Sequence, residues 1–171
     1  MLLLRGIASI SRWDGSTKVN RPDATIAGDV IADLRTSDNT LSVWLANTEE
    51  DIHDAVVALT LARDKVSKLT ALLLDDVSLA DMRIDLSSEA KGLAPGAVDS
   101  ITSKHRDMLE IDYKRIGSLA DYMMGLAKDG SKRKEYTKSQ VKNLLEQYRA
   151  AGKITPSDMR KQLLADLNWQ E

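Results

Sequence analysis

The sequence contains no cysteine and no phenylalanine, and only three of its 171 residues are proline. The missing cysteine excludes disulfide bonds, thiolate nucleophiles and cysteine-ligated zinc within this chain. Aromatic residues make up only 4% of the sequence, so Leu, Ile, Val, Ala and Met must fill its hydrophobic core.

Long hydrophobic runs are also missing. The opening MLLL is followed at once by Arg5 and Gly6, and a run this short is neither a signal peptide nor a membrane span. We therefore expect no membrane association and a cytoplasmic location. The hydrophobic content of 43% and the charged content of 29% are typical of a globular protein, and the length suits one domain with or without a helical extension.

Charge is unevenly distributed, although the net charge is only −2. Residues 1–127 carry 14 Lys or Arg against 20 Asp or Glu, whereas residues 128–171 carry 10 against 6. This asymmetry is weak evidence for a polyanionic partner. The residues available for phosphate contact are Lys132, Arg133, Lys134, Lys138 and Lys142.

The first ninety residues contain patterns that are typical of strands. MLLLRGIASI (1–10) predicts a buried strand, and the polar SRWDGSTKVNRPDAT (11–25) predicts a loop. VIADLR (30–35) and LSVWL (41–45) alternate apolar and polar residues on either side of TSDNT, which predicts a β-hairpin. RIDL (83–86) is expected to return a further strand to the same sheet.

Two long segments carry apolar residues at helical spacing. Thr48 and the acids after it match a capping box, and the apolar stripe behind them predicts one helix over 49–74. A second helix is predicted over 100–127, after a Gly- and Pro-containing connector. Its stripe consists of Leu109, Tyr113, Ile116, Ala120, Met123 and Ala127.

The C-terminal residues predict an αα-hairpin. Thr137 and Gln140 form a capping box, Gly152 is a natural helix end, and Thr155 followed by Pro156 opens a last helix. GKITPSDMRKQLL (152–164) is similar to helix pairs near the C-termini of some phage head proteins, a likeness from which we carry over no function. Short helices need a surface to dock on, and we expect a partner or second copy to provide it rather than the body of the chain.

Together these elements predict an α+β fold, with a small antiparallel sheet packed on a long helix. A helical C-terminal half ending in the αα-hairpin follows. We divide the chain into an α+β body (1–127), a basic linker (128–136) and a hairpin extension (137–171). The linker is expected to be the segment most sensitive to proteases, because its Gly and its Lys/Arg run keep the backbone solvated.

The motif most suggestive of chemistry is KHRD (104–107), since HRD opens the catalytic loop of protein kinases. The pattern requires Asn five residues after Asp107, but Asp112 stands there, and neither a Gly-rich loop nor DFG is present. The plainer interpretation is a histidine partly packed in the first turn of the second helix. The alternative is that His105 titrates near neutral pH and helps to bind a partner.

No other pattern predicts catalysis, a cofactor or a metal. Glu50-x-x-His53 has the spacing of one half of a di-iron motif, but the second half is missing. The sequence also lacks GxxxxGK[ST], GxGxxG and GxSxG. An enzyme is therefore the third-ranked hypothesis.

Candidate partner-binding residues come from two places. Arg12, Trp13 and Arg21 lie in the first loop, where an exposed Trp between arginines would be a binding hot spot. Trp13 folded back onto the core is an equally weighted alternative. Tyr148 and Trp169 lie on the hairpin, where they could anchor it.

The leading functional hypothesis is a small regulatory or adaptor protein that binds another protein, or a second copy of itself, without turnover. An inhibitor or immunity-type role fits the same observations. The alternative is a nucleic-acid-associated accessory protein that uses residues 128–142.

Overall fold

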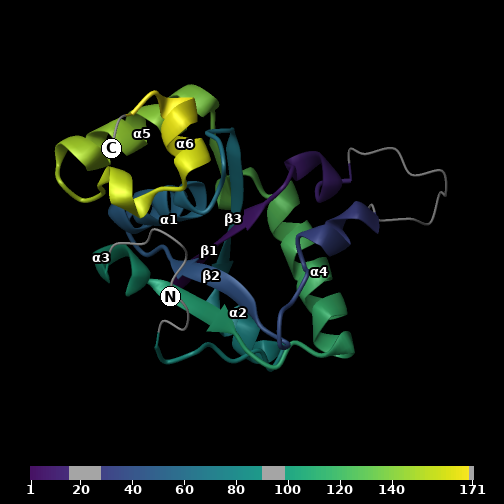
Figure 1. The fold of residues 1–171 in the computed structure, drawn as a ribbon. Coiled ribbons are helices and arrows are strands. Elements are labelled where there is room, and N and C mark those ends of the chain that lie inside the picture. The colour runs from purple at the N-terminus through teal and green to yellow at the C-terminus, as the bar shows by residue number, and fades with distance from the viewer. Residues whose placement is uncertain (16–27, 90–98, 170–171) are drawn as a thin grey trace.

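The computed structural model describes residues 1–15, 28–89 and 99–169. Its centre is an antiparallel five-stranded sheet with strand order β4-β2-β1-β3-β5 (Figure 1). The strands are β1 (Leu2–Ile7), β2 (Leu41–Leu45), β3 (Leu69–Asp75), β4 (His105–Met108) and β5 (Arg133–Tyr136). The predicted α+β fold with its small antiparallel sheet is confirmed.

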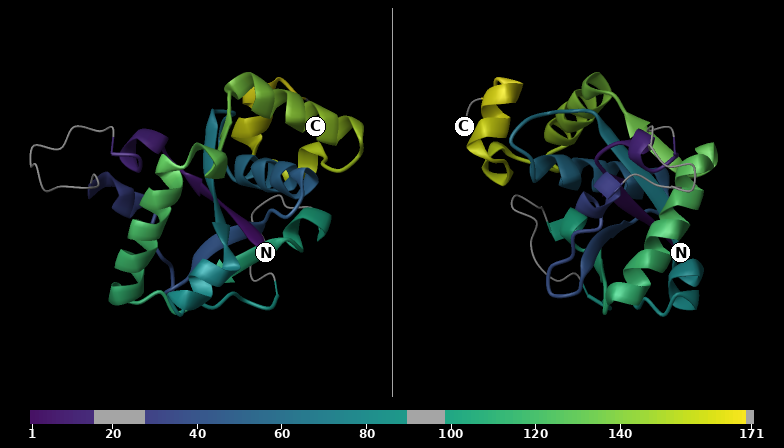
Figure 2. Two further views of the ribbon diagram at one scale, coloured as in Figure 1. Left: turned by 180° about the vertical axis from the view of Figure 1, so that it is seen from behind. Right: turned by 90° about the vertical axis from the view of Figure 1, so that its right-hand side faces the viewer.

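Helices cover both faces of this sheet (Figure 2). The first face packs against α1 (Glu49–Leu61), α3 (Asp99–Thr102), α5 (Lys138–Ala150) and α6 (Lys161–Leu167), and the second against α2 (Asp76–Asp81) and α4 (Tyr113–Lys128). Because side chains alternate along a strand, Leu4 of β1 enters the first core, whereas Leu3 and Ile7 enter the second. Short 3-10 helices are η1 (Ile10–Arg12), η2 (Gly28–Ala32), η3 (Gly130–Lys132) and η4 (Pro156–Asp158).

The helix predicted over 49–74 is wrong in its second half. The Thr48 capping box is present, since Thr48 Oγ1 accepts a hydrogen bond from the Asp51 amide at 3.1 Å. The helix ends at Leu61, however, and residues 69–75 form β3, of which every residue but the last is buried. A strand covered on both faces is apolar throughout, so its pattern resembles a continuing helical stripe.

The helix predicted over 100–127 is interrupted. Residues 105–108 form edge strand β4, which pairs with β2 through registers such as Met108 opposite Leu41. The chain then turns at Glu110, whose φ is 54°, and Asp112 caps a new helix from Tyr113. KHRD therefore lies mainly in a strand, and His105 is not in the first turn of a helix.

The hairpin predicted over 30–45 is also corrected. LSVWL forms β2, but residues 28–32 form 3-10 helix η2 and the partners of β2 are β1 and β4. RIDL contributes only an isolated bridge between Leu86 and Met108. The patterns of VIADLR (30–35) and RIDL (83–86) are typical of strands, but so short a pattern carries no information about the distant partner that decides whether a strand forms.

The C-terminal αα-hairpin is present, but it docks on its own chain. Thr137 caps α5 together with Gln140, and Gly152 follows the helix with a φ of 68°, a conformation that glycine adopts without strain. The hairpin's apolar side chains share one core with those of α1. Residues 133–136 of the predicted linker form β5, which pairs with β3.

Candidate partner-binding surface

The N-terminal candidate residues do not form an exposed hot spot. Trp13 is fully buried, and its indole Nε1 donates a hydrogen bond to Asp33 Oδ2 at 2.8 Å. The other oxygen of Asp33 accepts the Ala8 amide at 2.9 Å. Trp13 therefore fixes the chain after β1 onto the second core. Of the two alternatives for this residue, the structure has the one in which Trp13 folds back onto the core. Arg12 is half-buried, and Arg21 lies outside the described residues.

The hairpin candidates dock the hairpin onto the body. Tyr148 is buried, and its hydroxyl donates to Asp54 Oδ1 of α1 at 2.5 Å. Burial, and then the hydrogen bond to Asp54, raise the pKa of Tyr148 far above its usual range. Trp169 is half-buried against the same core, with the Arg149 guanidinium carbon 4.5 Å from its ring centroid.

The Tyr148 contact belongs to a wider polar cluster, which we call the α1 network. Lys104 Nζ lies 2.6 Å from Asp54 Oδ2 and 2.6 Å from Asp51 Oδ1. Burial opposes the charge of Lys104, but the hydrogen bonds to the two carboxylates outweigh it and raise the pKa of the ammonium group. These interactions join α1 to the start of β4 and to α5, so they hold the fold together.

His105 lies in β4 and contacts side chains of β2 and of its own strand, which is not a catalytic arrangement. It is buried, its ring centroid is 5.0 Å from that of Trp44, and its Nε2 is 3.7 Å from Asp107 Oδ1. Ser42 Oγ donates to the same Asp107 oxygen at 3.1 Å. A serine nucleophile needs the imidazole as its base, whereas the Ser42 hydroxyl donates its hydrogen bond to the carboxylate of Asp107. Titration of His105 near neutral pH stays a prediction.

Two of the basic residues of 128–142 point to opposite faces of the sheet, and three have a carboxylate nearby. Arg133 and Lys134 are consecutive in β5, so their side chains point to opposite faces of the sheet. Three carboxylates approach this set: Asp14 lies 4.0 Å from Arg133, Asp166 lies 3.7 Å from Lys138, and Glu146 lies 3.9 Å from Lys142.

The most exposed large apolar side chain of the described residues belongs to the apolar stripe of the helix predicted over 100–127. Tyr113 has 93% of its surface exposed. It is the first residue of α4, where the Asp112 side chain accepts the amides of Lys114 (3.0 Å) and Arg115 (2.8 Å). The hydrogen bond from the Arg115 backbone is the main cause that lowers the pKa of Asp112, so the cap is charged at neutral pH. Only the N-cap residue, Asp112, could have indicated that the helix starts here.

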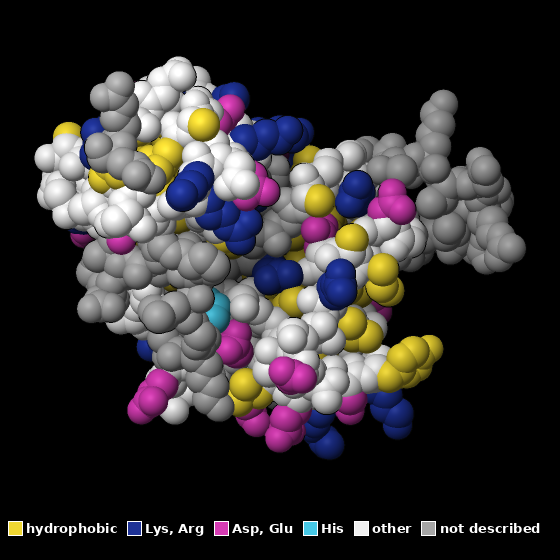
Figure 3. Space-filling view, viewed as in Figure 1, with side chains coloured by type: hydrophobic (Ala, Val, Ile, Leu, Met, Phe, Trp, Pro, Cys, Tyr) yellow, Lys and Arg dark blue, Asp and Glu magenta, His cyan; other side chains and the backbone are white. Residues whose placement is uncertain are grey.

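Two hollows lie where α4 begins, and both have Asp112 and Arg115 in their walls. One has a volume of about 390 Å³, and the other of about 230 Å³. Where α4 begins, Figure 3 shows hydrophobic side chains interspersed with acidic and basic ones. We call this region the α4 surface; it comprises Tyr113 and the residues that line the hollows: Asp38, Asn39, Thr40, Met82, Arg83, Leu109, Glu110, Asp112, Lys114, Arg115 and Ser118.

The backbone of the α4 surface is unusual. Four residues in the walls of its hollows have positive φ values, namely Asp38 (50°), Asn39 (59°), Arg83 (58°) and Glu110 (54°). Non-glycine residues adopt this conformation at a cost that the surrounding structure must offset. Arg115 contributes here, since its guanidinium donates to the Glu110 carbonyl at 2.7 Å. The loops at this surface are therefore held in one shape.

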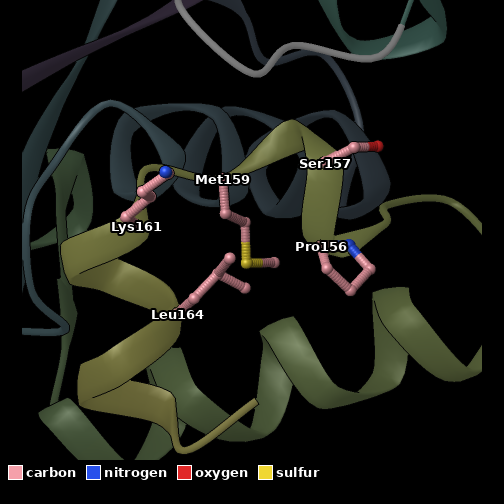
Figure 4. A pocket seen from close by; sticks show the side chains of 5 residues that line it. All are labelled: Pro156, Ser157, Met159, Lys161 and Leu164. Atoms are coloured by element: carbon pink, nitrogen blue, oxygen red, sulfur yellow. The ribbon is translucent and has the colours of Figure 1, made fainter. Parts of the chain in front are cut away.

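A separate hollow of about 580 Å³ lies on the hairpin (Figure 4). Pro156, Met159 and Leu164 provide its apolar wall, and Ser157 and Lys161 contribute to its lining. Its size is that of small-molecule sites.

No family model, curated protein or solved structure matches the chain. Within the described ranges, no group of three or more His, Asp or Glu side chains is placed to hold a metal ion. None of the helices described is long and apolar enough to cross a membrane.

Proposed function

We propose that the protein acts by binding another protein without catalytic turnover, as a regulatory, adaptor or inhibitory partner, and that the α4 surface is its principal contact. The exposure of Tyr113 is the observation that carries this proposal. Tyr and Arg are the residue types most often found at binding hot spots, and the α4 surface contains Tyr113, Arg83 and Arg115.

The shape of the α4 surface supports the same proposal. Its two hollows are lined in part by Asp112, the residue before the exposed Tyr113, and the hydrogen bonds of Asp112 and Arg115 fix the backbone where α4 begins. A surface that is ordered before binding loses less conformational entropy in the complex. The mixture of acids and bases favours a protein partner with charges of both signs over a polyanion.

The test is affinity purification from the native host with the wild-type chain and the Tyr113→Ala variant, followed by identification of the proteins that co-elute. A hot-spot tyrosine contributes at least about 2 kcal/mol, so we expect the variant to bind the recovered partner about thirtyfold more weakly. Ile31→Ala is the matched control, because Ile31 is 68% exposed and lies outside the α4 surface. A partner that binds both variants like the wild type would refute the role of Tyr113.

The nucleic-acid alternative has weaker support, because Asp14, Asp166 and Glu146 lie close to three of the five candidate cations. Salt dependence separates the two functions. A phosphate binder loses affinity steeply as salt rises, whereas a contact centred on Tyr113 changes little. Polynucleotide binding at low salt that vanishes in Lys134→Glu would favour the alternative.

A further inference from the structure

The two edges of the sheet differ in how they are covered. At the β4 edge, the Ser87 amide donates to the Asp107 carbonyl at 2.8 Å, and the Leu109 amide donates to the Asp85 carbonyl at 2.7 Å. At the other edge, β5 pairs with β3 on one side only. Among the described residues, no backbone hydrogen bond joins the outer side of β5 to another strand. An edge of this kind is a template for a further strand.

The sequence of β5, RKEY, disfavours a second copy of the chain as that strand. When two identical strands pair antiparallel around a two-fold axis, one residue always lies opposite itself. A register that pairs three residues of β5 therefore sets Lys134 opposite Lys134 or Glu135 opposite Glu135. Like charges directly opposite one another are destabilising.

The charges around β5 favour an acidic partner instead. Lys132 precedes the strand, Arg133 and Lys134 lie in it, and Lys138 follows it, whereas Glu135 is the one acid of residues 132–138. The guanidinium of Arg133 lies 4.0 Å from the carboxylate of Asp14, which is a long ion pair. Among the described residues, no carboxylate lies within 4 Å of the ammonium group of Lys134. Opposite charges on neighbouring strands stabilise their pairing.

A small hollow lies at the C-terminal end of β5. It has a volume of about 240 Å³ and is lined by Tyr136 together with His53 of α1 and four residues of α5: Gln140, Asn143, Leu144 and Gln147. The ring centroids of His53 and Tyr136 are 6.3 Å apart, nearly edge to face. Amide, imidazole and phenol groups suit a polar side chain from a strand placed on this edge.

We propose that β5 accepts an extended acidic segment of a partner protein as a sixth strand of the sheet. This inference rests on the proposed function in that both require a protein partner, but it concerns a surface separate from Tyr113. The α4 surface lies where α4 begins, whereas β5 follows the end of α4, so the two lie at opposite ends of this helix. Between α4 and α5 the chain crosses from one face of the sheet to the other (Figure 2).

The experiment uses the full-length chain and short labelled peptides that alternate Glu and Val. The matched control peptide alternates Lys and Val. Two further acidic peptides are N-methylated on their odd or their even backbone nitrogens, which leaves the charge unchanged. We expect the acidic peptide to bind and to slow amide hydrogen exchange in residues 133–136, and one of the two N-methylated peptides to bind at least about tenfold more weakly, because alternate amides face the neighbouring strand.

Variants of the protein sharpen the result. Lys134→Glu should weaken the acidic peptide about fivefold, whereas Lys65→Glu, which makes the same change in charge at an exposed loop position, should leave it unchanged. The proposal is overturned if both N-methylated peptides bind as well as the parent, or if residues 133–136 show no added protection. Tyr113→Ala should not alter peptide binding, so a failure here is distinguishable from a failure of the proposed function.

Discussion

Tyr148 and Tyr113 both lie on apolar stripes of the sequence, yet the fold treats them in opposite ways. Tyr148 is 7% exposed and its hydroxyl donates a hydrogen bond to Asp54, whereas Tyr113 is 93% exposed and follows Asp112, which lines two hollows. The difference arises because α5 packs along α1, whereas Tyr113 is the first residue of α4, whose buried residues begin only at Leu119. One ring stabilises the chain, and the other is available to a partner.

The largest effect should come from removing the two rings one at a time. Tyr148→Ala leaves a cavity in the first core and should lower the free energy of unfolding by about 3 kcal/mol. Tyr113→Ala should change it by less than about 0.5 kcal/mol, because its side chain packs against little. Urea denaturation monitored by circular dichroism measures both. Equal losses of stability would mean that Tyr113 is a structural residue.

A smaller effect isolates the hydroxyl of Tyr148. Tyr148→Phe keeps the ring but takes a hydrogen-bond donor from buried Asp54, which should cost about 1 to 3 kcal/mol. The double variant with Asp54→Asn tests the coupling, since an amide leaves no unpaired buried charge. If the loss of unfolding free energy in the double variant equals the sum of the losses in the two single variants, the hydroxyl of Tyr148 and the carboxylate of Asp54 do not stabilise one another in the fold.

The smallest effect concerns pH. The hydrogen bond from Lys104 is the main cause that lowers the pKa of Asp51 below its ordinary value of 3.8. The folded state therefore holds this proton less tightly than the unfolded state, so the stabilisation is present above about pH 4 and is lost as pH falls through the lower folded pKa. Asp51→Asn should be less stable than the wild type at neutral pH, with a difference that narrows in acid. A difference that stays constant down to pH 2 would contradict this cause.

Features that depend on residues close together in the sequence were the ones predicted correctly. The capping boxes at Thr48 and Thr137 correctly mark helix starts, because a cap is made by residues three positions apart. The first helix of the C-terminal hairpin was predictable for the same reason, whereas Thr155, expected to open the last helix, caps the 3-10 helix η4 and α6 begins only at Lys161. The strands β1 and β2 were predictable from their short apolar or alternating patterns. The partners of β2 were not, since pairing depends on residues far away along the chain, and β3 was not, because its continuous apolar run resembles a helical stripe.

The candidate site was the least predictable part. Tyr113 has the spacing of a core residue, and only the bend at Glu110 turns it outward. That bend depends on Arg115 and on the pairing of β4 with β2, neither of which a periodicity can show. Trp13 presents the reverse case, because its buried partner Asp33 is twenty residues away.

The strand order also constrains when the molecule can fold. β3 occupies residues 69–75, but the strand that covers its outer side is 133–136, and the helices that complete the first core follow at 138–150 and 161–167. On a ribosome, the apolar face of α1 and one side of β3 therefore stay uncovered until nearly the whole chain has emerged. Because these contacts join residues far apart in the sequence and form late, they slow folding. They also leave an intermediate with exposed apolar surface that a chaperone can recognise. A ribosome-bound chain stalled before residue 133 should accordingly behave as an aggregation-prone species, and one released at its full length should not.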